Sequence, residues 1–169
     1  MNKNYKMYSY FILGLSILAI MFAYTLELFD IYPCRLCIYQ RYVYYCLIIA
    51  ALSMLLFLKK GSEQTLNFLE WIIYCLLLAG MGIGIFQLLV EKHLINYESS
   101  CTTTIGNITS PEELFLSINS KDLVACDVPQ IEIFNLSLSA WSVLYMICIL
   151  CVSLLIMYKK RKTERNYGK

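Results

Sequence analysis

Four long stretches without a charged residue constrain this chain more than any other feature. They cover residues 7–26, 42–58 and 71–90 and part of the uncharged run 133–158. A helix of about 20 residues crosses the roughly 30 Å of a bilayer's hydrocarbon core. Backbone groups must be paired internally in hydrocarbon, and apolar runs without alternation fit helices rather than barrel strands. The pattern predicts an all-α membrane protein, a single-domain bundle of four transmembrane helices with spans near 7–26, 42–58, 71–90 and 138–158.

Composition agrees with a lipid environment. The 169 residues are 59% hydrophobic and only 15% charged, whereas soluble domains are about half apolar and a quarter charged. The net charge of +2 gives no reason to expect a nucleic-acid partner. The first apolar run is long for a signal peptide and lacks a small-residue cleavage site before Glu27, so we expect it to be retained as a span.

Basic residues indicate the orientation of the bundle. Ten of the 14 Lys and Arg residues lie near the two termini or between the second and third runs: Lys3, Lys6, Lys59, Lys60, Lys159, Lys160, Arg161, Lys162, Arg165 and Lys169. Loops rich in Lys and Arg stay in the cytoplasm. Both termini are therefore predicted to be cytoplasmic, with outer loops at about 29–40 and 91–137.

The long outer loop contains one helix signal. Ser110, Pro111 and Glu113 fit a capping box, and apolar residues follow at Leu114 and Phe115. We predict a short amphipathic helix in the extracytoplasmic loop. It would lie either on the membrane surface or against the bundle.

The eight cysteines separate by depth. Four lie inside predicted spans, where a thiol behaves mostly as a small apolar side chain: Cys46, Cys75, Cys148 and Cys151. Four lie in the outer loops, in a compartment where disulfides can form: Cys34, Cys37, Cys101 and Cys126. Cys148 and Cys151 also have C-x-x-C spacing, near the middle of the fourth predicted span. A thiolate there would be strongly desolvated, so we interpret the spacing as chance.

The outer C-x-x-C, Cys34 to Cys37, comes just before the second span. A helix N-terminus and nearby cations stabilise a thiolate, the reactive form. Arg35 supplies one cation, and Arg41 lies one turn beyond Cys37 on the same helix face. The motif favours redox chemistry, with half a zinc site or a plain structural bridge as alternatives. A second tight ligand pair is missing from the sequence, so no metal is predicted.

Cys101 and Cys126 enclose a polar loop. Taken alone, this pair indicates a structural disulfide. Together with a C-x-x-C on the same side of the membrane, it indicates a relay, in which one pair meets soluble partners and the other meets a molecule in the lipid.

Residues 33–42, PCRLCIYQRY, resemble the motif P-C-x-L-C-x-x-Q-R-Y of the DsbB family of disulfide bond formation membrane proteins. The order of spans and loop cysteines is also that of the family. Residues 134–141 are similar to its F-L-G-L-S-M-x-x-W segment, with Asn135 where glycine is expected.

This resemblance implies an oxidoreductase in the bacterial inner (cytoplasmic) membrane, with redox loops facing the periplasm. It would reoxidise a DsbA-like thioredoxin-fold thiol oxidase and pass the electrons to a membrane quinone, ubiquinone or menaquinone. The resemblance implies that Cys101 bonds to the partner and that Cys126 then attacks Cys34. Cys37 would be freed as a thiolate facing the quinone, and Arg41 would stabilise both.

His93 lies in a stretch similar to the family's F-Q-x-x-x-E-H segment near the quinone, with Lys92 inserted before the histidine. The resemblance implies a quinone-binding role for His93, and a solvated residue at a helix end is the alternative.

Two other functions remain open. A vitamin K epoxide reductase-like protein also has four helices and a quinone-type substrate, but there the loop pair precedes the C-x-x-C. A tetraspanin-like or claudin-like scaffold would carry structural loop disulfides, and its Cys37 would be inert.

Overall fold

Four long helices make up most of the structure, a computed structural model that describes residues 2–29, 31, 33–58, 62–95, 132–133 and 136–167. They are α1 (Asn2–Leu28), α2 (Arg35–Phe57), α3 (Glu63–Glu91) and α5 (Leu138–Tyr167). The short strands β1 (Glu132–Ile133) and β2 (Leu136–Ser137) pair antiparallel before α5. All four helices are long and apolar enough to cross a membrane. The predicted fold class, an all-α bundle of four membrane-crossing helices, is confirmed.

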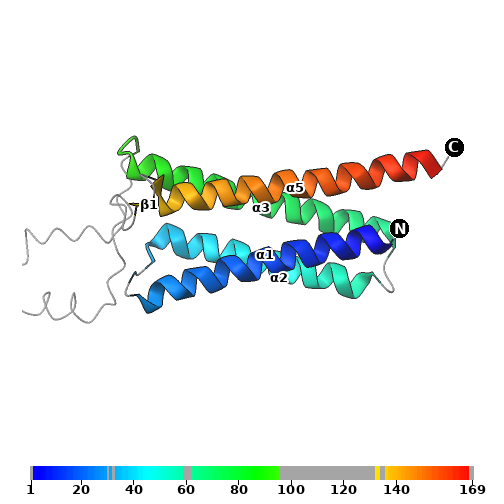
Figure 1. The fold of residues 1–169 in the computed structure, drawn as a ribbon, viewed down its shortest axis with the longest axis horizontal. Helices are drawn as coiled ribbons and strands as arrows, with labels where there is room; N and C mark the ends of the chain where they lie inside the picture. Colours follow the sequence, from blue (N-terminus) through cyan, green and yellow to red (C-terminus); the bar gives the residue numbers. More distant parts are fainter. Residues whose placement is uncertain are drawn as a thin grey trace, which may run out of the picture.

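The helices form a closed ring in which α1 packs on α2, α2 on α3, α3 on α5 and α5 on α1. Figure 1 shows that the start of α1 and the end of α5 lie at the same end of the bundle. The end of α3, the start of α2 and β1 lie at the opposite end, which we call the sulfur end because Cys34 and Cys37 are there.

A seven-residue repeat explains how the helices pack. The buried positions advance in steps of four and three, at Leu36, Gln40, Val43, Leu47, Ala50 and Met54 in α2. The same steps occur in α3, at Leu66, Glu70, Ile73, Leu77, Gly80, Gly84 and Gln87. Such spacing keeps one stripe of each helix facing its neighbours and is typical of four-helix bundles.

Two glycines let α3 approach its neighbours closely. A Cβ at Gly80 would lie 2.8 Å from Met146 Cε, and one at Gly84 would lie 2.7 Å from Val143 Cγ2. Both distances are too short for a real side chain. Glycines four residues apart are a common way to bring membrane helices together, because packing must replace the hydrophobic effect in lipid.

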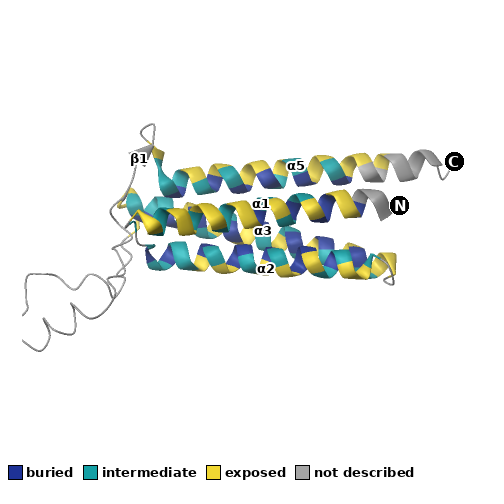
Figure 2. Ribbon diagram, turned by 60° about the horizontal axis from the view of Figure 1, so that its bottom comes forward, coloured by how far each residue is buried: buried dark blue, intermediate teal, exposed yellow. Residues whose placement is uncertain are grey.

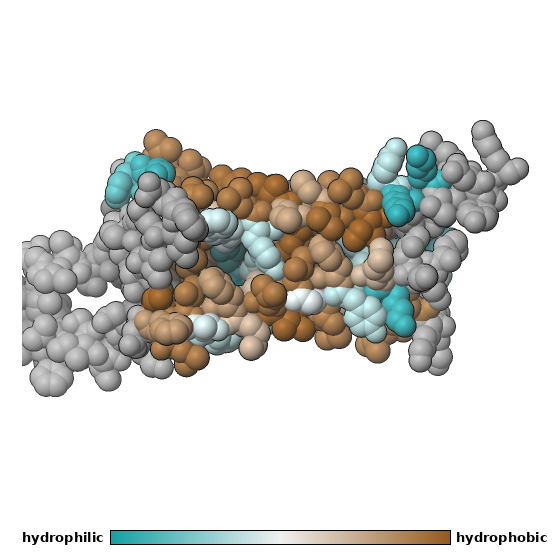
Figure 3. All heavy atoms as spheres, viewed as in Figure 1, coloured by the Kyte–Doolittle hydropathy of each residue, from teal (hydrophilic) through white to brown (hydrophobic). Residues whose placement is uncertain are grey.

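The outer surface of the bundle is apolar. Large side chains such as Leu18, Met21, Leu56 and Leu155 are more than half exposed, and exposed positions recur along every helix (Figure 2). Figure 3 shows mostly hydrophobic residues on one face between more hydrophilic ends. An apolar surface of this extent is unfavourable in water and suits hydrocarbon.

The helices extend beyond the uncharged runs that predicted them. α2 begins at Arg35, so residues 35–40, expected in the outer loop, are helical. α3 begins at Glu63 and contains Glu70, which is only 3% exposed. Uncharged runs indicate hydrocarbon, whereas a helix continues through charged residues until its backbone groups are capped. The predicted amphipathic helix after Ser110 lies outside the described residues.

Candidate redox site at the sulfur end

Cys34 and Cys37 meet at the N-terminus of α2. Cys34 is the N-cap residue, with extended backbone angles, and its Sγ accepts a hydrogen bond from the Cys37 backbone N–H at 3.3 Å. The two Sγ atoms are 2.9 Å apart, and both cysteines are free. A disulfide bond is about 2.05 Å long. A small movement would therefore join the two sulfurs.

The two sulfurs differ in exposure. Cys34 is 3% exposed and packs with Leu36 and Val90, whereas Cys37 is half-buried beside the same cluster. Apolar surroundings penalise a thiolate unless donors or cations compensate. The neighbouring polar groups therefore decide what this pair can do.

Arg41 is a cation of α2 whose charge acts on Cys37. Its guanidinium bonds to the Glu27 carboxylate of α1, with 2.5 Å between Nη1 and Oε1, and Nη2 donates to the Ala23 carbonyl at 3.4 Å. The guanidinium carbon lies 5.3 Å from the centre of the Tyr24 ring. Sequence reasoning placed Arg41 beside Cys37 but did not anticipate this anchoring to α1.

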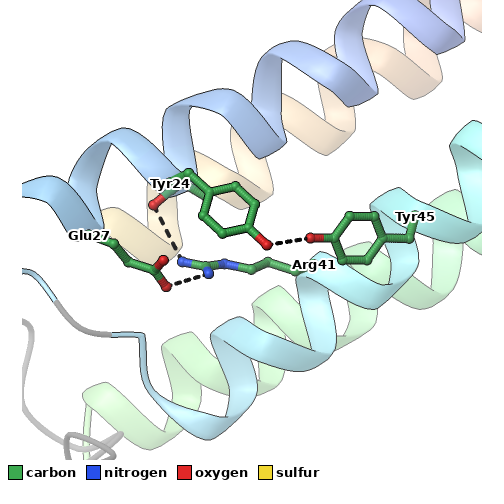
Figure 4. A network of polar contacts seen from close by, with 5 residues as sticks. Tyr24, Glu27, Arg41 and Tyr45 are labelled. Carbon is green, nitrogen blue, oxygen red and sulfur yellow. Dashed lines mark hydrogen bonds and ion pairs between the residues drawn. The ribbon is translucent and has the colours of Figure 1, made fainter.

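Two phenol groups complete this side of the site. The Tyr24 and Tyr45 hydroxyls are 2.8 Å apart and join α1 to α2 next to the Arg41 ion pair (Figure 4). Tyr24 is 48% exposed. A cation, aromatic rings and hydroxyls therefore lie together at the apolar outer surface, one turn from Cys37.

Gln87 of α3 contacts both sulfurs from the other side. Its Nε2 lies 3.4 Å from Cys37 Sγ and 3.6 Å from Cys34 Sγ. The same nitrogen is 3.4 Å from Glu91 Oε1, and Ser139 of α5 donates to Glu91 Oε2. Sequence reasoning included Gln87 in the segment similar to F-Q-x-x-x-E-H but gave it no role. Two features of the sequence distinguish Gln87. It is a single amide in an apolar run, four residues before Glu91, and it continues the three- and four-residue spacing of the buried positions of α3.

Comparison with known families agrees with this geometry. The family model described as "Disulfide bond formation protein DsbB" matches residues 5–156. The chain belongs to the DsbB family. An uncharacterised protein of Rickettsia prowazekii (strain Madrid E), RP370, is 26% identical over 166 residues, covering 94% of this chain and 92% of the relative. No solved structure matches the chain.

DsbB membership implies an oxidoreductase of disulfide bond formation. With four membrane-crossing helices, the chain fits a multi-pass membrane protein. The resemblance seen in the sequence around Cys34 and Arg41 is thereby confirmed at the level of the family.

His93 follows α3 and is exposed. It has a positive φ of 55°, its N–H bonds to the Val90 carbonyl, and the Leu94 N–H bonds to the Leu89 carbonyl. This is the Schellman arrangement, which ends a helix with a left-handed residue, usually glycine. The position therefore has a backbone role at the sulfur end of this DsbB protein, and quinone binding by His93 remains a prediction.

The remaining cysteines lie elsewhere. Cys101 and Cys126 are outside the described residues. Those in the helices are all exposed on the outer surface: Cys46, Cys75, Cys148 and Cys151. Within the described ranges, no group of three or more His, Cys, Asp or Glu side chains could hold a metal ion.

Proposed function

We propose that this DsbB-family protein is a quinone-dependent thiol oxidase of the bacterial inner membrane. It reoxidises a DsbA-like, periplasmic thioredoxin-fold protein. The observation that carries the proposal is the pair of cysteine sulfurs 2.9 Å apart at the start of a membrane-crossing helix, one turn from Arg41.

The exchange sequence conserves electrons and protons. A partner thiolate attacks Cys101 of the Cys101–Cys126 disulfide, bonds to Cys101 and frees Cys126 as a thiolate. Cys126 then attacks Cys34, which breaks the Cys34–Cys37 bond and leaves its electron pair on Cys37. The partner's second thiol displaces Cys101 to leave an oxidised partner, and Cys101 attacks Cys126 to restore the Cys101–Cys126 bond and free Cys34. Cys34 and Cys37 would re-form their disulfide by passing two electrons and two protons to the quinone. The net reaction converts a partner dithiol and a quinone into a partner disulfide and a quinol.

The residues beside Cys37 fit a quinone. A bound quinone would accept the two electrons and two protons released by the partner thiols. The half-buried Cys37 lies near a fixed guanidinium on an otherwise apolar surface, and the Tyr24 and Tyr45 hydroxyls are adjacent. Arg41 can stabilise negative charge on the sulfur and on a quinone oxygen, and the aromatic rings suit a flat ring ligand.

The described elements on either side of the long loop support contact between the two cysteine pairs. The end of α3 and the strand β1 both lie at the sulfur end (Figure 1). The segment that carries Cys101 and Cys126 is therefore attached at the end where Cys34 and Cys37 lie. The lysine-rich end of α5 lies at the opposite end, in agreement with cytoplasmic termini.

Turnover in proteoliposomes tests the proposal. Purified protein with ubiquinone or menaquinone should oxidise a reduced thioredoxin-fold partner, measured as lost partner thiols and reduced quinone. Cys37→Ser should abolish turnover. Cys148→Ser is the matched control, because Cys148 lies on the outer surface of α5, and it should retain activity. Turnover that survives Cys37→Ser, or an inert wild-type protein with both quinones, would contradict the proposal.

Trapping tests the order of exchange. Cys126→Ser leaves Cys101 as a free thiol that can attack the disulfide of an added oxidised partner, and a partner bonded through Cys101 should accumulate because Cys126 is absent to displace it. Mass spectrometry of the trapped peptide identifies the cysteine. A partner bonded through Cys34 would overturn the assignment of roles.

A further inference from the structure

The Gln87 side chain is placed to donate to more than one acceptor. Its Nε2 carries two hydrogens and lies within 3.6 Å of both sulfurs and of Glu91 Oε1. One hydrogen can point at the carboxylate while the other is shared between the sulfurs. Gln87 is only 5% exposed, so water does not compete strongly for this amide.

The chemistry of the neighbours fixes which end of the amide faces them. Turning the amide over would put Oε1 against a carboxylate and two sulfurs, all of which accept hydrogen bonds when charged. In the present orientation, Oε1 is buried without a hydrogen-bond partner in the described part of the chain. The structure thus leaves the carbonyl unsatisfied while the N–H groups face the sulfurs.

A second helix holds this orientation. Ser139 of α5 donates to Glu91 Oε2, and the Ser139 and Ser137 hydroxyls are 2.8 Å apart. Ser139 is 3% exposed. Glu91 is therefore held by α5 while its other oxygen faces the Gln87 amide, and rotation of the amide would cost this contact.

We propose that Gln87 is a catalytic residue of the exchange step, and that Glu91 and Ser139 are positioning residues that aim its amide. This role rests on the proposed function. When Cys126 attacks Cys34, the Cys34–Cys37 bond breaks and Cys37 leaves as a thiolate. The Gln87 N–H, 3.4 Å from that sulfur, stabilises the new charge. Hydrogen bonds to charged groups are stronger than neutral ones, and more so away from water.

The decisive measurement is the alkylation rate of Cys37 as a function of pH. The background is Cys34→Ser, Cys101→Ser and Cys126→Ser, in which serine remains a good N-cap for α2. A charged, membrane-impermeant maleimide modifies the detergent-free reconstituted protein between about pH 6 and pH 10, a range that brackets ordinary thiol ionisation. Mass spectrometry identifies the modified cysteine.

Gln87→Met removes the donor and keeps a similar length. The loss of one hydrogen bond to a charged group should slow alkylation about tenfold near pH 7. The rates should converge at high pH, where the thiol is fully ionised in both proteins. Gln40→Met is the matched control, because Gln40 is equally buried and bonds to Ser142; its profile should be unchanged.

Two other results would overturn the inference. One is an unchanged profile in Gln87→Met. The other is equal slowing at every pH, which indicates altered access or packing. Ser139→Ala is the milder variant, and it should give a smaller slowing with the same convergence at high pH.

Quinone-dependent turnover of wild-type protein, measured on the same preparation, separates the two proposals. If the wild-type protein turns over but Gln87→Met leaves the pH profile of Cys37 alkylation unchanged, the inference alone is refuted. If Gln87→Met changes the pH profile of Cys37 alkylation but the wild-type protein shows no quinone-dependent turnover, the contact between amide and sulfur is supported and the proposed function is refuted.

Discussion

The Arg41 guanidinium of α2 bonds directly to the Glu27 carboxylate of α1. Both side chains are mostly buried, at 16% and 27% exposure. The cation expected to act on Cys37 is therefore already paired, and its position depends on the neighbouring helix. This arrangement ties the N-terminal part of α2 to the C-terminal part of α1.

Arg41→Ala should destabilise the protein by about 1–3 kcal/mol, because the Glu27 charge loses its partner in a poorly hydrated site. Denaturation in mixed micelles measures this change. Adding Glu27→Gln to Arg41→Ala should recover part of the stability, since the uncompensated charge is removed. Strictly additive losses in the double variant would show that the two side chains are not coupled.

Gly84→Ala should destabilise the bundle by about 1–3 kcal/mol, since the new Cβ must displace neighbouring atoms in a packed core. It would lie 2.7 Å from Val143 Cγ2 and 2.9 Å from Gln40 Nε2. Gly82→Ala is the control, because nothing lies within 4 Å of its Cβ. Thermal unfolding should show a loss for Gly84→Ala only, and equal losses would argue against the close approach of α3.

His93→Gly should keep or raise stability by up to about 1 kcal/mol, because glycine adopts the left-handed conformation without strain. His93→Ala should be less stable than His93→Gly, since alanine retains the unfavourable φ of 55°. Comparison of the two melting curves tests this order. Turnover then separates the roles of the residue: if the imidazole binds quinone, both variants lose activity equally despite their different stabilities.

In reduced protein carrying Cys101→Ser and Cys126→Ser, Cys37 should react with a bulky maleimide before Cys34. The reason is access, because Cys34 is 3% exposed and packed under Val90, whereas Cys37 is half-buried. Time-resolved peptide mapping gives the order. Earlier labelling of Cys34 would contradict this order and mean that this end of the bundle opens readily.

The sequence was sufficient to predict the four spans, because long uncharged runs have few other stable environments. The uncharged run 42–58 is shorter than α2, since the charge on Arg35 and Arg41 marks the edge of hydrocarbon rather than the end of a helix. Cys34 as an N-cap explains why the helix begins where it does. The motif spacing also placed Cys37 and Arg41 on one helix face correctly.

Contacts between helices could not be predicted in the same way. The Arg41 ion pair requires the rotation of α1 relative to α2, and the Gln87 contact requires the position of α3 along α2. Hydrophobicity alone fixes neither quantity, because all sides of these helices are apolar. The roles of Cys101 and Cys126 remain predictions, since both residues lie outside the described ranges.

Gly80 and Gly84 lie on the same face of α3 as Gln87, which follows Gly84 by three residues. Glu91 follows Gln87 by four residues, about one further turn. The close packing of Gly80 and Gly84 against neighbouring side chains therefore sets how far along the bundle the Gln87 amide lies relative to the sulfurs. A slip of α3 by one helical turn would carry Gln87 about 5.4 Å along the bundle, out of reach of both cysteines. A substitution at Gly80 or Gly84 that loosens the packing of α3 would therefore alter the reactivity of the thiols, although neither glycine is itself a reacting group.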